Sequence, residues 1–322
     1  MTYFSAFAGA GGFELALRDH ACVGFSEIDR SALAVYRLHF PHHTAYGDIT
    51  QLDARAIPPF ELLVAGFPCQ AYSVAGRRQG FGDARGAVFF DLARLIAAKR
   101  PRLLLLENVR GLLSHANGQT FTYVLAALDE LGYDCQWEVR DAREHTVQRR
   151  LRLFLIGHRR DTRRPQVFPL AASDCRVPPI AMTRDHGTWR ERDDATAIDA
   201  SYAKGIDNHG QRTAIYMPRR PRRGCVLLQR PRGKNPGQAL GFAPTVTRGA
   251  GDGNLALQRG RLRRLTPREC ERLMSWPDDW TRDGVSESGE QIELSDRARY
   301  SLCGNGVVTA TVRPILDILT HT

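Results

Sequence analysis

The stretch ELLVAGFPCQ, residues 61–70, joins an apolar run to a turn that holds one cysteine, Cys69. A second run, RLLLLENV at 102–109, has similar length and apolar character. Short apolar runs bounded by turns are typical of parallel strands that are buried on both faces. The segment between the two runs, GAVFFDLARLIAAKRP at 86–101, has helical spacing and ends at Pro101. This order of strand, helix and strand predicts part of a parallel α/β sheet.

The same alternation continues on both sides of this unit. Strands are predicted at 2–9, 22–29 and 152–159, and helices at 13–20, 31–40 and 120–133. The first half of the chain therefore predicts an α/β, doubly wound, Rossmann-like domain over residues 1–158, in which ligands bind at the carboxyl ends of the strands.

After about residue 158 the composition changes. Segments such as MPRRPRRG and QRPRGKNPG are rich in Pro, Gly and Arg and have few periodic stretches. They predict a smaller, irregular, β-containing domain at 159–262. Helical patterns return in TPRECERLMSWPDDW at 266–280 and NGVVTATVRPILDIL at 305–319, so residues 263–322 are expected to complete the first domain.

The positive charge is concentrated in one segment. The chain has a formal net charge of +10, and residues 176–264 hold 18 Lys and Arg against 7 Asp and Glu. The remainder of the chain is close to neutral. A basic segment beside a neutral one indicates a surface that binds a polyanion such as a nucleic acid.

The cysteines and the apolar runs exclude several classes of protein. Seven cysteines occur without a CxxC pair, which argues against a disulfide framework and against a zinc site, so no metal is expected. No apolar run approaches the roughly 20 residues of a membrane helix. The start of the chain lacks the pattern of a signal peptide. We expect a cytoplasmic protein with reduced thiols and no membrane partner.

Three strand ends carry residues suited to a nucleoside-containing cofactor. FAGAGG at 7–12 is a glycine-rich turn between a strand and a helix, where a ligand can approach the backbone closely. Glu27 can accept hydrogen bonds from ribose hydroxyls, and Asp48 from an adenine amino group. Each feature alone also fits tight packing, a helix cap or a solvated turn, and their order favours the cofactor.

Three further features are candidates for chemistry. Cys69 fits either a small buried hydrophobe or a nucleophile. Burial of Glu107, at the end of LLLLENV, would raise its pKa toward neutrality and suit it to proton donation, although a helix cap is an equal alternative. Arg150 and Arg152 are expected on one side of a strand, where they can hold an anion or a base carbonyl, or form an edge-strand charge pair.

Eight signatures in one order resemble the DNA cytosine carbon-5 methyltransferases, especially bacterial members of restriction–modification type. They are FAGAGG, EID, GDIT, GFPCQ, ENV, QRRLR, RRLTPRE and CGNGVV, and with the basic insert left out they span residues 3 to 318. The resemblance implies S-adenosylmethionine as cofactor and double-stranded DNA as substrate. It implies a catalytic domain at 1–158, a target-recognition domain at 159–262, and a return segment at 263–322 that completes the catalytic domain.

The resemblance also implies residue roles. Cys69 matches the nucleophile that adds to carbon 6 of a flipped-out cytosine, and Glu107 matches the acid that assists at ring nitrogen 3. Arg150 and Arg152 match the arginines around the cytosine. The cofactor pocket would be lined by Phe7, Ala8, Gly9, Gly11, Gly12, Glu27, Ile28, Asp48, Ile49, Pro68 and Asn305. DNA contacts are expected from Gln70, Ser73, Arg77, Arg78, Arg85, Arg232, Lys234 and Arg248. The segment after Cys69, SVAGRRQGFGDARG, has the composition of a lid that closes over DNA.

Two positions depart from the family pattern. Ser5 stands where many members have an acid before the glycine turn (DLFAG), and Ile28 stands where an aromatic side chain often stacks on adenine. Both departures concern affinity for the cofactor. We expect a monomer, with a companion restriction endonuclease that acts separately.

Three other functions are consistent with parts of the sequence. Methylation of tRNA uses the same chemistry in one branch of the family, but the basic insert and the lid favour DNA. A binding protein that has lost turnover is disfavoured by the presence of Cys69, Glu107 and Arg152. A nicotinamide-dependent oxidoreductase would explain only the glycine turn.

Overall fold

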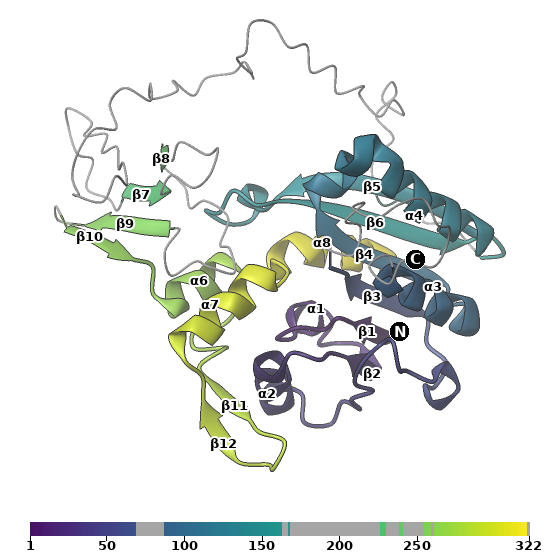
Figure 1. The fold of residues 1–322 in the computed structure, drawn as a ribbon, viewed down its shortest axis with the longest axis horizontal. Helices are drawn as coiled ribbons and strands as arrows, with labels where there is room; N and C mark the ends of the chain where they lie inside the picture. Colours follow the sequence, from purple (N-terminus) through teal and green to yellow (C-terminus); the bar gives the residue numbers. More distant parts are fainter. Residues whose placement is uncertain are drawn as a thin grey trace, which may run out of the picture.

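The computed structural model describes residues 1–68, 87–162, 167 and 261–320, together with strands at 226–229, 238–240 and 254–258. In the described part of the chain, six strands lie side by side in the order β2-β1-β3-β4-β6-β5 (Figure 1). Their bounds are β1 Thr2–Ala6, β2 Ala21–Ser26, β3 Leu62–Gly66, β4 Leu103–Val109, β5 Tyr133–Asp141 and β6 Leu151–Arg159. Strands β2, β1, β3 and β4 run parallel to one another, whereas β6 is antiparallel to both β4 and β5. The predicted α/β architecture is confirmed, with one antiparallel strand in the sheet.

Helices cover both faces of this sheet because alternate side chains of each strand point to opposite faces. One face packs Leu63, Leu104 and Leu106 against α3 (Ala87–Lys99) and α4 (Gln119–Glu130). The other face packs Leu62 and Leu105 against α1 (Gly12–Ala16) and α8 (Thr309–Thr320). Both faces of the central strands are buried, which explains why those strands are continuous apolar runs in the sequence.

Several elements differ from the sequence prediction. Helix α1 has five residues, and α6 (Pro267–Leu273) covers only half of the helix that was predicted there. Helix α2 (Arg30–His39) agrees with its prediction to within one residue at each end. Helix α7 (Asp296–Asn305) and the hairpin β11 (Asp283–Val285) and β12 (Gln291–Glu293) were not predicted. Helix α6 is short because its chain reverses at Ser275, which has the left-handed backbone angle φ 57°, just before Pro277.

A second, four-stranded antiparallel sheet falls almost entirely in the segment predicted to form a β-containing domain. Its strand order is β10-β9-β7-β8. The bounds are β7 Val226–Gln229, β8 Gln238–Leu240, β9 Asn254–Gln258 and β10 Arg261–Arg264.

The C-terminal segment returns to the glycine turn near the N-terminus. Trp280 Nε1 donates to Ala10 O at 2.8 Å, and Thr309 Oγ1 donates to Gly12 O at 3.2 Å. Helix α8 packs against α1 (Figure 1). The span Asp296–Thr320 is long and apolar enough to cross a membrane by composition, but more than half of it is buried, as expected for helices of a core.

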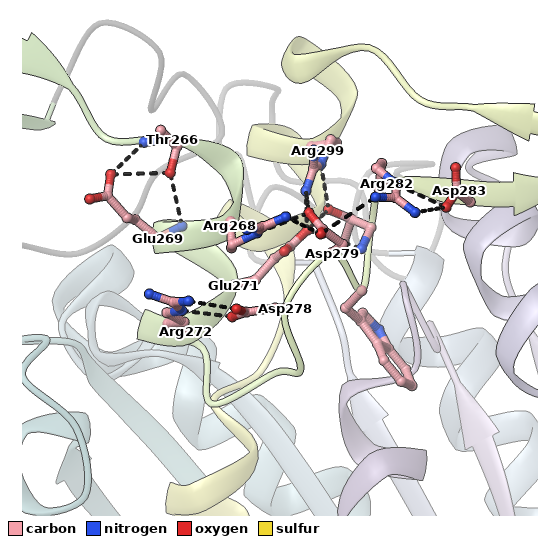
Figure 2. Close-up of polar contacts among 12 residues, drawn as sticks. Thr266, Arg268, Glu269, Glu271, Arg272, Asp278, Asp279, Arg282, Asp283 and Arg299 are labelled. Carbon is pink, nitrogen blue, oxygen red and sulfur yellow. Dashed lines mark hydrogen bonds and ion pairs between the residues drawn. The ribbon is translucent and has the colours of Figure 1, made fainter.

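Buried and exposed ion pairs connect α6 to the segment that follows it (Figure 2). Arg299, on α7, is 8% exposed and donates to Glu271 Oε1 at 2.9 Å and to Asp279 Oδ1 at 3.3 Å. Glu271 is fully buried on α6 and also accepts hydrogen bonds from the backbone and hydroxyl of Thr281. This arrangement fixes α7, and with it Asn305 at its end, relative to α6.

Candidate active site

Strands β3 and β4 bring two of the predicted catalytic segments to one edge of the sheet. Gly66, the last residue of β3, pairs with Glu107 of β4 in parallel register. The chain then leaves β3 through Phe67 and Pro68. Asn108 is buried, and its Nδ2 donates to Phe67 O at 3.0 Å. The segment that leads to Cys69 is therefore fastened beside Glu107, although Cys69 itself lies outside the described residues.

Glu107 lies in a nearly closed environment with one direct ionic partner. Its Oε1 is 2.9 Å from Arg152 Nε, and both side chains are largely buried. Arg152 lies on β6 opposite Val109, so the antiparallel pairing of β4 and β6 places the two charges together. Burial raises the pKa of Glu107 above its ordinary value, and the charges of Arg152 and Arg150 oppose part of that rise. The carboxyl group can thus hold a proton at a higher pH than an exposed glutamate.

Arg150 lies one residue before β6, and its charge acts on both Glu107 and Arg152. It is 2% exposed and donates through Nη2 to Gly304 O at 3.1 Å and Gly306 O at 2.6 Å. Burial and the neighbouring charge of Arg152 lower the pKa of Arg150 to about 9. These contacts tie the start of β6 to the turn on either side of Asn305. The placement of Arg150 and Arg152 on one side of the strand stays a prediction.

The glycine turn at 7–12 has a backbone conformation that its sequence only partly explains. Gly9 and Gly11 have φ of 59° and 86°, in the left-handed region that favours glycine. Phe7 has φ 56°, which is unusual for an aromatic residue and is typical of functional sites. A Cβ atom at Gly9 would have no heavy atom within 4 Å, so the backbone of the turn is open on that side to a ligand.

Glu27, at the end of β2, is hydrogen-bonded to this turn. Its Oε2 accepts from Gly9 N at 2.8 Å, while Oε1 accepts from Ile28 N at 2.7 Å and Asp29 N at 2.8 Å. A carboxylate has about four acceptor positions, so one position on Oε2 is open for an incoming hydroxyl. Binding both ribose hydroxyls, as predicted for Glu27, requires the carboxylate to release one of these amides.

Asp48 is placed beside Glu27 by a segment that runs along the edge strand β2. Ser26 Oγ donates to Gly47 O at 2.6 Å, and Phe25 pairs with Ala45 in parallel. Asp48 is half-buried and accepts from Thr50 N at 2.9 Å. The structure thus brings the glycine turn, Glu27 and Asp48 to one edge of the sheet.

The other predicted cofactor residues differ in exposure. Ile28 is 68% exposed next to Glu27, where its apolar side chain can cover a flat ring. Pro68 and Asn305 are exposed, whereas Ala8, Gly11, Gly12 and Ile49 are buried. The buried residues shape the backbone of the site, and a ligand can touch the exposed ones. The residues present therefore fit a cofactor that contains a nucleoside, with acceptors for ribose and an amino group and an apolar side chain for a flat ring.

The DNA-contact predictions fall outside the described residues. They are Gln70, Ser73, Arg77, Arg78, Arg85, Arg232, Lys234 and Arg248.

Sequence analysis missed two residues of the site. Asn108 was quoted in ENV without a role, and it fastens β3 to β4. Glu14 was placed on a helix without a role, yet it is fully buried on α1, two residues after the last glycine of the turn. No local pattern marks Glu14, because an acid on a helix usually faces solvent and only the packing of the folded protein buries this one.

Comparisons with known proteins agree with this architecture and site. The model of the C-5 cytosine-specific DNA methylase family matches residues 1–321. Type II methyltransferase M.NlaX of Neisseria lactamica is 34% identical over 97% of this chain and 93% of its own length. M.HhaI of Haemophilus parahaemolyticus is 32% identical over 96% of this chain and 90% of its own length.

Solved structures match the fold. The Dnmt2 methyltransferase of S. pombe gives a TM-score of 0.66 with 18% identity, covering 100% of this chain and 98% of its own. The Entamoeba histolytica methyltransferase EhMeth gives 0.62 with 13% identity, covering 100% and 98%. The family model and the two Type II methyltransferases each match nearly the whole chain, so this protein belongs to the C-5 cytosine-specific DNA methylase family.

Proposed function

We propose that the chain transfers a methyl group from S-adenosylmethionine to carbon 5 of a flipped-out cytosine in a short duplex sequence, through a covalent adduct with Cys69. The observation that carries the proposal is the buried Glu107–Arg152 pair, at the strand edge toward which the Cys69 segment leads. A buried carboxyl group with a raised pKa beside a guanidinium suits recognition of a cytosine ring nitrogen and carbonyl.

The chemistry needs an activated ring because carbon 5 of cytosine is a weak nucleophile. The Cys69 thiolate forms a bond to carbon 6 while Glu107 donates a hydrogen bond or proton to nitrogen 3, which turns the ring into an enamine. Bound S-adenosylmethionine would supply an electrophilic methyl group for carbon 5. Loss of the carbon-5 proton to a base then lets the carbon–sulfur bond break, which restores the thiolate, and any proton on nitrogen 3 returns to Glu107. Because carbon 6 is attacked from above the ring, the base must leave the duplex stack.

The chain's own residues have separate tasks in this scheme. Arg152 holds Glu107 and offers donors to the base carbonyl. Arg150 holds the 304–306 turn in place. The glycine turn, Glu27, Asp48 and Ile28 would hold the cofactor through its amino acid, ribose and adenine portions.

The relatives and the charge distribution support DNA as substrate. Three relatives that are 30–34% identical over at least 96% of this chain are named Type II methyltransferases. Their names support a restriction–modification role and a separately acting endonuclease. Residues 159–262 hold most of the excess positive charge and are proposed as the target-recognition domain. The likeness to Dnmt2, at 18% identity, concerns the fold and does not bear on the substrate.

The decisive experiment is base-resolution methylation sequencing of a methylation-free bacterial host that expresses the chain. Protected cytosines in one short motif are expected, and they are expected to disappear with Cys69→Ala at equal soluble protein. Cys135→Ala is the matched control, because Cys135 lies on the edge strand β5, opposite Gly157 of β6 and outside the family signatures. An unmodified genome with modified tRNA would replace DNA by tRNA as substrate, and residual methylation in Cys69→Ala would contradict the covalent step.

A further inference from the structure

A buried carboxyl group lies beneath the glycine turn, and the proposed chemistry does not use it. Glu14 is the third residue of α1 and has no exposed surface. Its Oε1 accepts a hydrogen bond from Tyr36 Oη on α2 at 3.1 Å. Its Oε2 is buried without a hydrogen-bond partner. Burying a carboxyl group that has no charged partner costs free energy of folding, so the presence of Glu14 at this position calls for a physical reason.

Glu14 faces Ser5 of the neighbouring strand. Ser5 is fully buried on β1, and its hydroxyl lowers the pKa of the Glu14 carboxyl, although neither Ser5 Oγ nor Glu14 Oε2 completes a hydrogen bond of ordinary geometry. Ser5 is the position at which the sequence departs from the DLFAG pattern, where an acid is usual. The acid that is absent from β1 is thus matched by an acid on α1 that points at the same place.

We propose that Glu14 is a positioning residue for the cofactor turn, and that its carboxyl group, supplied from α1, replaces the acid that DLFAG sequences supply from the strand at position 5. This inference rests on the proposed function, because the turn at 7–12 is taken to bind S-adenosylmethionine. Glu14 touches no reacting atom; it acts through the turn.

The contacts of Glu14 join the elements that meet at the turn. Glu14 comes two residues after Gly12, Ser5 comes two residues before Phe7, and Tyr36 belongs to α2, which follows Glu27. Tyr36 Oη is also 3.0 Å from His43 Nδ1, which extends the network to the loop before Asp48. The carboxyl group therefore connects the two ends of the turn to the segments that carry Glu27 and Asp48.

The backbone conformation of the turn is strained at Phe7, so the turn needs surrounding contacts such as those of Glu14 to hold it. Phe7 keeps φ 56°, a conformation that persists only where the surroundings hold it. The carboxyl group beneath it is surrounded by Tyr3 of β1, Cys22 of β2, Tyr36 of α2 and, across the turn, Glu27. Burial, and more weakly the charge of Glu27, raise the pKa of Glu14 to about 7. A second acid at position 5 would add like charge to this closed space, so the site accommodates one carboxyl group.

The test is to exchange the two side chains in the full-length protein. Glu14→Ser removes the carboxyl group, Ser5→Asp adds a second one, and Ser5→Asp with Glu14→Ser moves the single acid to the strand. Isothermal titration with S-adenosylmethionine at pH 7 is expected to give at least tenfold weaker binding for each single variant. The double variant is expected to bind within about threefold of the wild type. The maximal methylation rate on saturating cofactor should change little in the double variant.

Rescue by the exchange separates positioning from general packing, since a packing role would make the two losses add. If the Glu14→Ser protein does not fold, Glu14→Gln replaces it in the test because glutamine keeps the shape of the side chain. The Glu14→Gln protein should also bind S-adenosylmethionine more weakly than the wild type. This inference would be overturned if the double variant bound S-adenosylmethionine no better than Glu14→Ser, or if Glu14→Gln bound it as well as the wild type. In either case, methylation by the wild type would leave the proposed function intact. A wild-type protein that binds no S-adenosylmethionine would refute both.

Discussion

Glu107 is held between two opposing effects, burial that favours the neutral acid and the charge of Arg152 that favours the carboxylate. Because burial dominates, its pKa lies above the ordinary value, and the proton needed at cytosine nitrogen 3 is available until pH rises through that pKa. The single-turnover rate of the wild type is therefore expected to fall on the alkaline side. Glu107→Gln should lower the rate by about 10²- to 10⁴-fold and remove that alkaline decline. Rates measured from pH 5.5 to 9 with saturating DNA and cofactor check this.

The control for this variant is Glu130→Gln, an exposed position at the end of α4, which should keep both the rate and the profile of the wild type. DNA affinity should be unchanged in both variants. A Glu107→Gln protein with wild-type turnover would remove Glu107 from the acid role.

Individual site residues were predictable where a local rule applied. Glu107 at the end of an apolar run and Arg152 in the strand predicted at 152–159 follow from the sequence, and the structure pairs them across β4 and β6. The hydrogen bonds of Arg150 to Gly304 O and Gly306 O could not be predicted, because they join segments about 150 positions apart. Glu14 was not found, since an acid on a helix is usually solvent-exposed and only the three-dimensional packing buries it.

At the scale of elements, the junction of α6 and α7 depends on one buried ion pair. Removal of the Arg299 guanidinium in Arg299→Met would leave the fully buried Glu271 carboxylate without its charged partner (Figure 2). Breaking one side of a buried pair typically costs about 3–5 kcal/mol of unfolding free energy, whereas replacing both partners by apolar residues costs less. Urea denaturation should therefore show a large loss for Arg299→Met and a smaller one for Arg299→Met with Glu271→Leu.

The neighbouring pair Arg272–Asp278 supplies the comparison. Both side chains are exposed, so solvent screens their attraction, and Arg272→Met should leave the unfolding transition nearly unchanged. Equal stability of Arg299→Met and the wild type would show that this pair does not hold α6 and α7 together.

Element prediction succeeded for apolar runs and failed where the pattern was mixed. β5 reads YDCQWEVRD, with polar residues at most positions and Trp137 40% exposed, so no apolar run marks it. The reversed direction of β6 could not be predicted, because hydrophobic spacing reports which faces are buried and not which way a strand runs. Helix α6 ends just before the left-handed Ser275, and Pro277 two residues later is a stop signal that the predicted helix at 266–280 disregarded.

At the scale of the whole molecule, the site joins residues about 300 positions apart. The turn at 7–12 receives hydrogen bonds from Trp280 and Thr309, and Arg150 holds the backbone beside Asn305. Sequence analysis expected the C-terminal segment to complete the first domain, because helical patterns return there. Which atoms meet could not be predicted, since these contacts join segments without any shared local pattern.

The uneven charge of the chain predicts how DNA binding responds to salt. Each basic residue that neutralises a phosphate releases a counterion, so the logarithm of the binding constant falls linearly with the logarithm of salt concentration. Arg222→Gln with Arg223→Gln, in MPRRPRRG of the basic segment, should weaken DNA binding and reduce that slope by up to about 2. Affinity for S-adenosylmethionine should not change. Fluorescence anisotropy with a duplex that contains the methylated motif, from 50 to 300 mM salt, measures both quantities.

The matched control removes the same net charge from another part of the chain. Arg55→Gln with Arg297→Gln alters two exposed arginines outside the basic segment, and it should leave the salt slope unchanged. Overall charge acts on both variants alike, so a difference between their slopes reports contact with phosphates by residues 222 and 223. Identical slopes for the two variants would mean that net charge alone steers the DNA, and the target-recognition role of residues 159–262 would lose its electrostatic support.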